Sequence, residues 1–287
     1  MLVGFFVYFC IAKPLIKPFI IKMTTQKRLL SWTAACAATF FVSGVLLSAC
    51  HTKAVLTSTA PTTRQHYLMA LADAQQPNQS KVSNDLMPIS DDNKALEWTT
   101  VGDMKMVLVC KMIDQQTVPL FARPDTFRIS TRSGYWVSLP ADWARRADQF
   151  EGLDSVAARR RMVEMLGLWP ECDYDMVATF YVDVSRLFRP AYDPTITTTT
   201  SPADFPAWVD ENYTVGGGVN FRKWFADQQS SAYQGRKACP WAQLGYSYDW
   251  HSNAPRQGIS EYIATDKSVV LTKKVQGVWS FVKELTK

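Results

Sequence analysis

The chain has 287 residues, of which 47% are hydrophobic and 13% aromatic, and its 31 lysines and arginines against 26 acidic residues give a formal net charge of +5. Five of the basic residues and none of the acidic ones lie in residues 1–49, so residues 50–287 carry 26 of each and no net charge. Because a nucleic-acid-binding surface needs a standing positive charge, this balance excludes a nucleic acid as the expected partner.

The N-terminal region has the layout of a secretory signal. A basic pair, Lys27-Arg28, precedes an almost uncharged and mostly apolar run over residues 29–49, and small residues end this run. The end of the run and the next residue read Leu47-Ser48-Ala49-Cys50. They resemble the lipobox of bacterial lipoproteins, a family in which a diacylglyceryl group is attached to the cysteine thiol and a peptidase cuts before that cysteine. The resemblance implies that Cys50 is lipidated and becomes the first residue of the mature protein.

Two further hypotheses concern this region. Residues 1–22 form a second apolar stretch, interrupted by Lys-Pro pairs, and Met23 begins a cleaner signal. We therefore expect residues 1–22 to be an over-extended N-terminus and residues 23–49 to be the signal peptide. The alternative is that residues 29–49 stay uncleaved as a membrane anchor, because about 20 apolar residues suffice to cross a bilayer.

The segment after the signal is polar. Residues 50–94 are rich in threonine, serine, glutamine, asparagine and aspartate and have little apolar periodicity. Such a composition buries too little apolar surface to offset the entropy lost on ordering. The sequence therefore predicts a flexible tether over residues 50–94, with room for a short helix over residues 64–74, and a globular domain over residues 95–287.

The globular region contains apolar runs with β-branched residues, which are typical of strands. In chain order, the expected strands are residues 104–112, 117–122, 126–132, 134–140 and 176–184, followed by a closing hairpin of residues 261–265 and 268–274. The expected helices are residues 141–150, 155–166 and 220–233. Residues 188–215 read as a long loop, which is uncommon in a compact domain and often functional. Runs of strands with separate helices indicate a single α+β domain with a mainly antiparallel sheet and about two to three helices.

The helix over residues 155–166 carries an unusual charge. At 100° per residue its apolar stripe consists of Val156, Met162, Val163 and Leu166. Arg159 falls in the middle of this stripe, whereas Arg161 points away from it. A buried guanidinium needs a carboxylate partner. The alternative is that the stem of Arg159 packs and its head reaches solvent.

Residues 240–253 form the chemically densest stretch of the chain. Their aromatic residues are candidates for a ligand groove that binds a sugar or peptide, namely Trp241, Tyr246, Tyr248 and Trp250. Asp249 and His251 are candidate hydrogen-bonding or acid–base groups, and His251 is the only histidine after residue 94. The alternative is plain packing, because Tyr246, Tyr248 and Trp250 share one face of a strand.

The cysteines that follow Cys50 are Cys110, Cys172 and Cys239. Cys110 lies in an apolar strand pattern and is expected to be buried and free. Cys172 and Cys239 lie in proline-containing loops and form a possible disulfide in an exported protein. No spacing of histidine and cysteine typical of a metal site is present, and no cofactor motif is found, so neither a metal nor a cofactor is expected.

These features predict a lipid-anchored protein of the cell envelope. The membrane is the expected partner through the anchor, and an envelope protein or a glycan is the expected partner of a binding or assembly module. The alternative is an envelope hydrolase that uses Asp249 and His251. In the enterobacterial version of the lipoprotein family, aspartate after the lipidated cysteine favours inner-membrane retention. His51 at this position therefore implies delivery to the outer membrane, facing the periplasm or the surface, in a host with two membranes.

Overall fold

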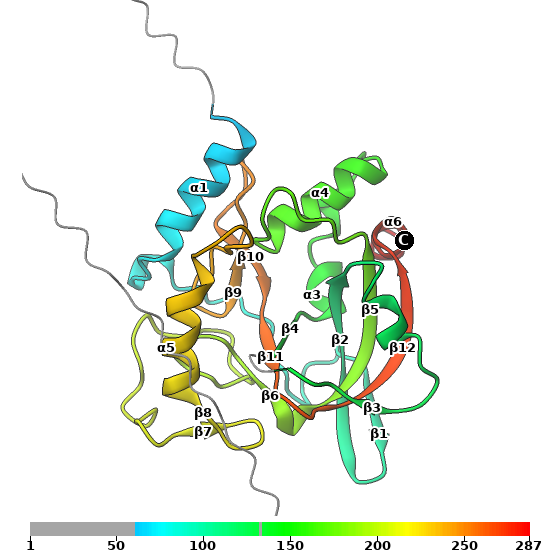
Figure 1. Ribbon diagram of the computed structural model, residues 1–287, viewed down its shortest axis with the longest axis vertical. Coiled ribbons are helices and arrows are strands. Elements are labelled where there is room, and N and C mark those ends of the chain that lie inside the picture. The colour runs from blue at the N-terminus through cyan, green and yellow to red at the C-terminus, as the bar shows by residue number, and fades with distance from the viewer. Residues whose placement is uncertain (1–60, 132–133) are drawn as a thin grey trace, which may run out of the picture. The chain divides into compact units, whose positions relative to one another are not determined.

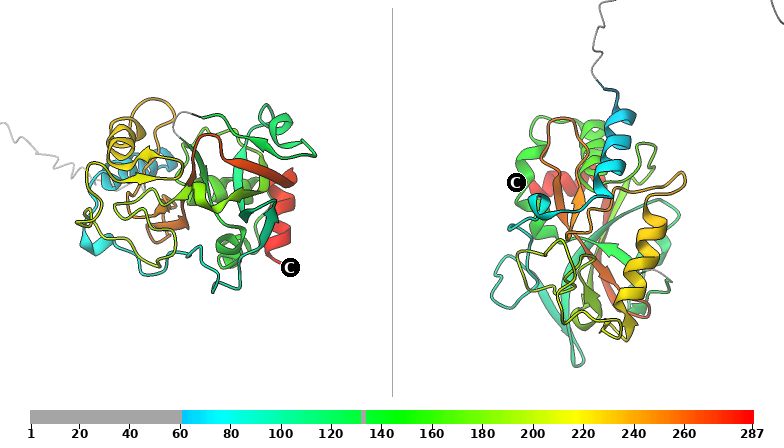
Figure 2. Two further views of the ribbon diagram at one scale, coloured as in Figure 1. Left: turned by 90° about the horizontal axis from the view of Figure 1, so that it is seen from below. Right: turned by 90° about the vertical axis from the view of Figure 1, so that its left-hand side faces the viewer.

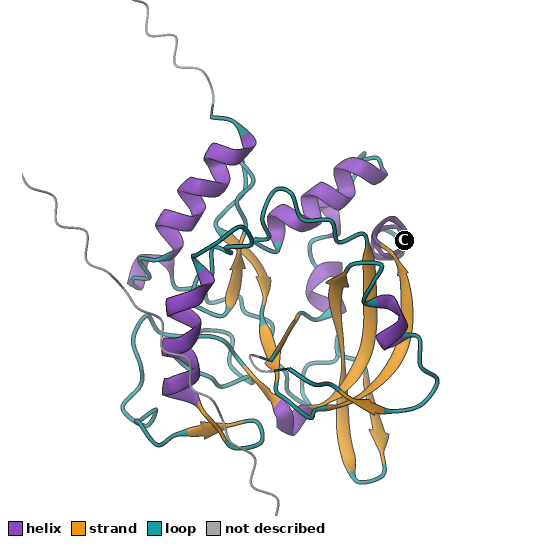
Figure 3. Cartoon of the chain, viewed as in Figure 1, coloured by secondary structure: helices purple, strands orange, loops and turns teal. Residues whose placement is uncertain are grey.

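A computed structural model describes residues 61–131 and 134–287, which form an α+β domain (Figures 1 and 3). The predicted signal peptide, the start at Met23 and the lipidation at Cys50 lie outside the described residues. Every strand pair found within them is antiparallel, so the predicted fold class is confirmed. None of the helices in the described part of the chain has both the length and the apolar character needed to span a membrane.

The largest sheet has five strands in the order β1-β2-β5-β12-β3. Their bounds are β1 Trp98–Val101, β2 Met104–Ile113, β3 Phe127–Arg128, β5 Met176–Asp183 and β12 Val269–Gly277. Side chains alternate between the two faces of a strand. Accordingly, Val107 and Val109 of β2 enter one apolar cluster, while Cys110 and Met112 enter another on the opposite face. Both faces of the central strands are therefore covered, which explains why β2 reads as an almost continuous apolar run.

A second sheet of three short strands adjoins the first. It has the order β4-β11-β6 and contains β4 Tyr135–Val137, β6 Leu187–Phe188 and β11 Tyr262–Ala264. The two sheets are joined where Cys110 and Ser138 exchange backbone hydrogen bonds of 2.8 and 3.0 Å. Two further ribbons of two strands complete the β structure, namely β7 Thr214–Val215 with β8 Val219–Asn220 and β9 Tyr246–Tyr248 with β10 Gln257–Ser260.

The helices cover the sheets from several sides. They are α1 Thr63–Ala74, α2 Val118–Phe121, α3 Pro140–Ala144, α4 Ser155–Met165, α5 Phe221–Ala232 and α6 Val278–Leu285, and the 3-10 turns are Gln79–Lys81, Ala147–Phe150 and Val184–Arg186. Figure 2 shows α5 and α6 at opposite ends of the domain. Asp154 caps α4 by accepting from the amides of Val156 and Ala157, and Asn220 caps α5 by accepting from the amide of Lys223. These caps satisfy amides that have no partner inside the helix.

The tether prediction is wrong for residues 61–94, because this segment is packed into the domain. Leu86, Met87 and Ile89 are at most 3% exposed. The amide of Leu86 donates to the carbonyl of Thr199 at 2.9 Å, and that of Ile89 to the carbonyl of Ile196 at 2.8 Å. A few buried apolar side chains thus fix this mostly polar segment to the domain. The long loop after β6 supplies the carbonyl groups that accept its backbone hydrogen bonds.

Two other local predictions also fail. Residues 117–122 contain the short helix α2 rather than a strand, with a proline in the first helical turn, where its missing N–H costs nothing. The closing hairpin is not formed, because β11 and β12 join different sheets. Between them Lys267 has a φ of 63°, and its amide donates to the carbonyl of Ile129 at 2.9 Å, which directs β12 toward β3.

The number of helices is also larger than predicted. The described residues hold six α-helices, of which α2 and α3 have only four and five residues. Helices this short leave almost no periodic signal in a sequence. The C-terminal helix α6 was not expected, and its Val278, Phe281 and Val282 are buried in the same cluster as α4.

Candidate functional site

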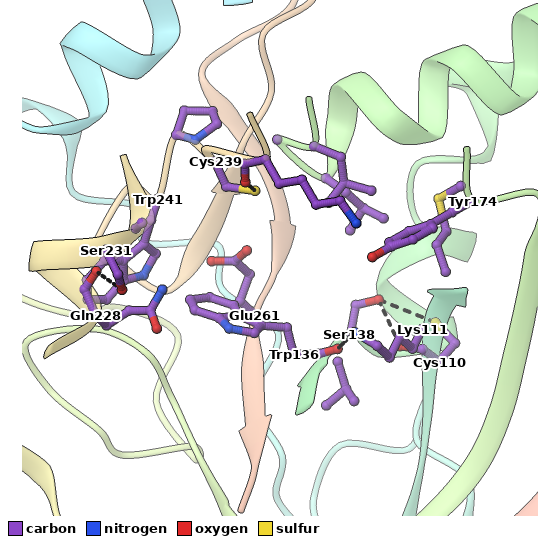
Figure 4. Close-up of a pocket in the computed structure, with 18 residues that line it drawn as sticks. Cys110, Lys111, Trp136, Ser138, Tyr174, Gln228, Ser231, Cys239, Trp241 and Glu261 are labelled. Atoms are coloured by element: carbon purple, nitrogen blue, oxygen red, sulfur yellow. Dashed lines mark hydrogen bonds between the residues drawn. The ribbon is translucent and has the colours of Figure 1, made fainter. Parts of the chain in front are cut away.

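A pocket of about 420 Å³ lies where the two sheets meet (Figure 4). Its walls come from β2, β4 and the second half of α5, and from residues 166–168 after α4, Tyr174, residues 237–241 and Glu261 just before β11. The size is within the range of about 300–1,000 Å³ that is usual for small-molecule sites. The side chains with chemical potential are Lys111, Tyr174, Lys237, Cys239 and Glu261, and indole walls are provided by Trp136 and Trp241.

The local fold explains why these groups converge. In the three-stranded sheet, Ile263 pairs with Trp136 and Tyr262 pairs with Val137, so Glu261 lies at the end of this ladder. The backbone amide of Glu261 donates to the carbonyl of Gly245 at 3.0 Å. On the other side, Gly167 ends α4 with a φ of 65°, and a Cβ there would lie 3.0 Å from the carbonyl oxygen of Tyr248. The absence of a side chain lets the end of α4 approach the β9 region closely.

The side chain of Glu261 forms no ion pair in the described part of the chain. It is half-buried, and its Oε2 is shielded from solvent without any hydrogen-bond partner. Burial raises the pKa of this carboxyl from its ordinary value of 4.5 to about 8. Figure 4 shows the carboxylate facing into the pocket, between Trp136 and Cys239. A buried carboxylate that lacks a partner is costly to keep, so its position calls for a functional explanation.

Lys111 is the basic residue of the pocket floor. Its position in the middle of β2 is half-buried, and its Nζ donates to the carbonyl of Trp136 at 3.2 Å. Burial lowers the pKa of the ammonium to about 8, and the nearby thiols of Cys239 and Cys172 oppose this change. The pocket therefore contains an acid and a base whose pKa values are both shifted to about 8.

The predicted disulfide is absent, because Cys110, Cys172 and Cys239 are all free thiols. Cys172 packs into the cluster beneath α4, whereas Cys239 lines the pocket and donates to the carbonyl of Lys237 at 3.5 Å. Burial raises the pKa to about 12 for Cys110 and Cys239 and to about 11 for Cys172. These thiols stay protonated at neutral pH, and a protonated thiol is a poor nucleophile.

The predicted aromatic groove is not formed. Trp241 lies in one apolar cluster, Tyr246 in a second, and Tyr248 and Trp250 in a third, and all four are at most 8% exposed. The hydroxyl groups of the two tyrosines form hydrogen bonds inside the domain. That of Tyr246 donates to the carbonyl of Lys81 at 2.8 Å, and that of Tyr248 donates to Asp73 Oδ2 at 2.9 Å. The packing interpretation is therefore right, and of the four only Trp241 lines the pocket.

Asp249 and His251 do not form an acid–base pair. Arg161 binds Asp249 with two hydrogen bonds, of 2.9 Å to Oδ1 and 2.6 Å to Oδ2, and both residues are buried. His251 contacts Asp249 only through its backbone amide, at 3.1 Å, and its Nδ1 accepts from the amide of Asn253. The carboxylate is thus committed to Arg161, and the geometry gives the hydrolase alternative no support.

The prediction for the charge on α4 named the wrong arginine. Arg161 is 7% exposed, whereas Val156, expected in the apolar stripe, is 76% exposed. Arg159 is half-buried and donates to the carbonyls of Tyr174 and Cys172. Residues 161–165 at the end of α4 are all buried, so this half of the helix has no exposed side onto which Arg161 could point. The buried arginine with a carboxylate partner is therefore Arg161 and not Arg159.

Sequence reasoning missed both Glu261 and Lys111. The available signal was a single charge inside or beside an apolar strand, in "VLVCKM" and in "SEYIA". In the described ranges 61–131 and 134–287, no group of three or more histidine, cysteine, aspartate or glutamate side chains is arranged to hold a metal ion. The chain matches none of the protein-family models, curated proteins or solved structures with which it was compared.

Proposed function

We propose that the chain is a lipid-anchored protein of the cell envelope whose packed domain binds a small molecule in the pocket of Glu261. The observation that carries this function is the unpartnered carboxylate of Glu261 in a cavity with two indole walls. Small-molecule sites are typically apolar hollows with a few convergent polar groups of shifted pKa. A cavity of this size accommodates a small molecule rather than a folded protein or a long glycan.

Binding is favoured over catalysis by the way the polar groups are arranged. Lys111 donates to a backbone carbonyl, Cys239 donates to another, and Glu261 Oε2 has no hydrogen-bond partner within the described residues. A nucleophile and a base that cooperate are normally within hydrogen-bond reach of each other. The groups of the pocket are separate recognition elements rather than a connected relay.

The pocket is tested with three water-soluble probes of matched size: 3-phenylpropan-1-ol, 3-phenylpropan-1-amine and 3-phenylpropanoate. The full chain is reconstituted in nanodiscs, titrated by calorimetry, and corrected with empty nanodiscs. Ser231→Trp fills the pocket from α5, and Ser230→Trp, on the same helix but outside the lining, is the control. We expect at least one probe to bind the unmodified chain and the control but not Ser231→Trp. If the two tryptophan variants behave alike toward all three probes, the pocket is not a binding site.

The anchor is tested separately by feeding expressing cells radiolabelled palmitate. We expect the mature protein to carry label, because two or more acyl chains are needed to hold a protein firmly on a bilayer. Cys50→Ser removes the acceptor thiol, and Cys36→Ser, in the signal peptide, is the matched control. Label on the Cys50→Ser chain, or its absence from the unmodified one, would contradict the anchor.

A further inference from the structure

The geometry points to a small organic cation, an amine or quaternary ammonium group on an apolar body, as the ligand class of the pocket, with Glu261 as its counter-ion. This inference rests on the proposed function and adds the charge and shape of the ligand. It follows from three features: a carboxylate without a partner, aromatic walls beside it, and an apolar volume behind it.

The carboxylate is the first feature. An ionised carboxylate out of water requires a cation or several hydrogen bonds. Other buried carboxylates of the domain have such partners: Asp249 binds Arg161 twice, and Asp142 binds Arg145 at 2.7 Å. Among residues 61–131 and 134–287, Glu261 finds no such partner, although its Oε2 is fully shielded. A cationic ligand would supply the ion-pair partner that neither lysine of the lining, Lys111 or Lys237, provides in the described structure.

The aromatic walls are the second feature. The ring centroids of Trp136 and Trp241 are 6.1 Å apart with an interplanar angle of 83°, and Trp136 is half-buried. Figure 4 shows the carboxylate of Glu261 beside the indole of Trp136. A cation near the face of an indole is attracted by the electrons of the ring, and this attraction strengthens when water is excluded. A carboxylate beside an indole is therefore well suited to an ammonium group.

The rest of the pocket suits the apolar body of such a ligand. Met112, Val137, Leu166, Leu168 and Pro240 contribute carbon surface to the lining. On the side opposite Glu261, the hydroxyl of Tyr174 points into the pocket (Figure 4). A molecule with one cationic end and an aromatic or aliphatic body would bury its carbon atoms here and keep its charge at Glu261.

The other titratable groups around Glu261 decide how binding depends on pH. From the end of α5 and the segment after it they are Tyr233, Lys237 and Cys239, and from β2 and the segment before β5 they are Lys111 and Tyr174. Burial holds the pKa of Cys239 and Tyr174 near 12 and that of Tyr233 well above its usual range. Glu261 and Lys111 each have a pKa shifted to about 8. As the pH rises, Glu261 gains a negative charge and Lys111 loses its positive charge. Both changes favour the binding of a cation.

The test compares the three probes on the full chain in nanodiscs. At pH 8 we expect the amine to bind about 10- to 100-fold more tightly than the alcohol, the usual effect of a charge-assisted hydrogen bond, and the carboxylate to bind least. Glu261→Gln should remove the advantage of the amine and leave the alcohol unchanged. Below pH 8 the affinity for the amine should fall by up to about tenfold per pH unit, with no change for the alcohol.

A variant of the second titrating group completes the test. With Lys111→Met the amine should bind more tightly, since one positive charge leaves the pocket, and its affinity should still fall below pH 8, because Glu261 still takes up a proton. If the alcohol or the carboxylate binds as tightly as the amine, or if Glu261→Gln keeps the preference for the amine, the cation assignment is refuted while the pocket stands. If no probe distinguishes Ser231→Trp from Ser230→Trp, the pocket itself is refuted.

Discussion

Replacing Glu261 with glutamine should change the stability of the domain more and more favourably as the pH rises. The pKa of this carboxyl is about 8 in the folded domain, against an ordinary value of 4.5 in an unfolded chain. Below pH 4.5 both states hold the proton, and the group has no effect. Between pH 4.5 and 8 the unfolded chain releases the proton while the folded domain keeps it, so unfolding becomes easier as the pH rises. Well above pH 8 both states have released the proton, and the loss no longer grows.

The magnitude follows from the size of the shift. Each pH unit between the two pKa values corresponds to about 1.4 kcal/mol, so the loss between pH 5 and pH 7 is on the order of 2 kcal/mol for this half-buried group. For a domain of this size, that difference corresponds to about 4–8 °C in melting temperature. Glu261→Gln removes the titration, and its advantage over the unmodified chain should widen by this amount from pH 5 to pH 7.

The assay is thermal unfolding followed by tryptophan fluorescence at pH 5, 6, 7 and 8. A constant offset between the two proteins carries no weight, because the amide of glutamine also has to be accommodated in the pocket. The informative quantity is the change of the offset with pH. Glu151→Gln, at an exposed position, is the control and should show no such change. An offset for Glu261→Gln that is equal at pH 5 and pH 7 would refute the reasoning.

Three other substitutions test the packing. Arg161→Met leaves Asp249 buried without its cation and should cost about 3–5 kcal/mol of unfolding free energy, measured by urea titration, whereas an effect below about 1 kcal/mol would contradict a buried ion pair. Leu86→Ala, at a site only 1% exposed, should cost about 2–5 kcal/mol, and a negligible cost would restore the tether interpretation. Gly167→Ala should destabilise more than Gly152→Ala: both glycines have positive φ, of 65° and 72°, but only at Gly167 would the Cβ crowd another residue. Equal melting temperatures for the two alanine variants would contradict that contact.

The central strands could be predicted from the sequence because their pattern is long and strongly apolar. β2 and β5 lie close to the ranges expected for them, and the caps at Asp154 and Asn220 mark the starts of α4 and α5. The C-terminal hairpin could not be predicted in this way, because two neighbouring strands pair with each other or with distant partners according to contacts that are remote in sequence. At Lys267 those contacts direct β12 away from β11.

The candidate site was harder to predict than the fold. Aromatic density drew attention to residues 240–253, but four of these aromatic side chains are divided among three clusters of the core. Glu261 and Lys111 are more than a hundred residues apart, and no spacing rule connects them. They share one pocket because β2 and β4 meet at Cys110 and Ser138, which is a property of the tertiary structure. The sequence left open whether Arg159 on α4 has a carboxylate partner, and it placed Arg161, which does have one, on the exposed side, because helical periodicity does not show that residues 161–165 are all buried.

The junction at Cys110 and Ser138 has a consequence for the mechanics of the domain. The two backbone hydrogen bonds there are short but few, and the pocket lies directly over them. A ligand bound in the pocket would contact both sheets and oppose their separation. The amide protons of this junction should therefore exchange with deuterium more slowly when the ligand is bound. A free ligand concentration of one hundred times the dissociation constant adds about 2.7 kcal/mol to the free energy of unfolding. The stability of the domain would then depend on the concentration of the ligand around it.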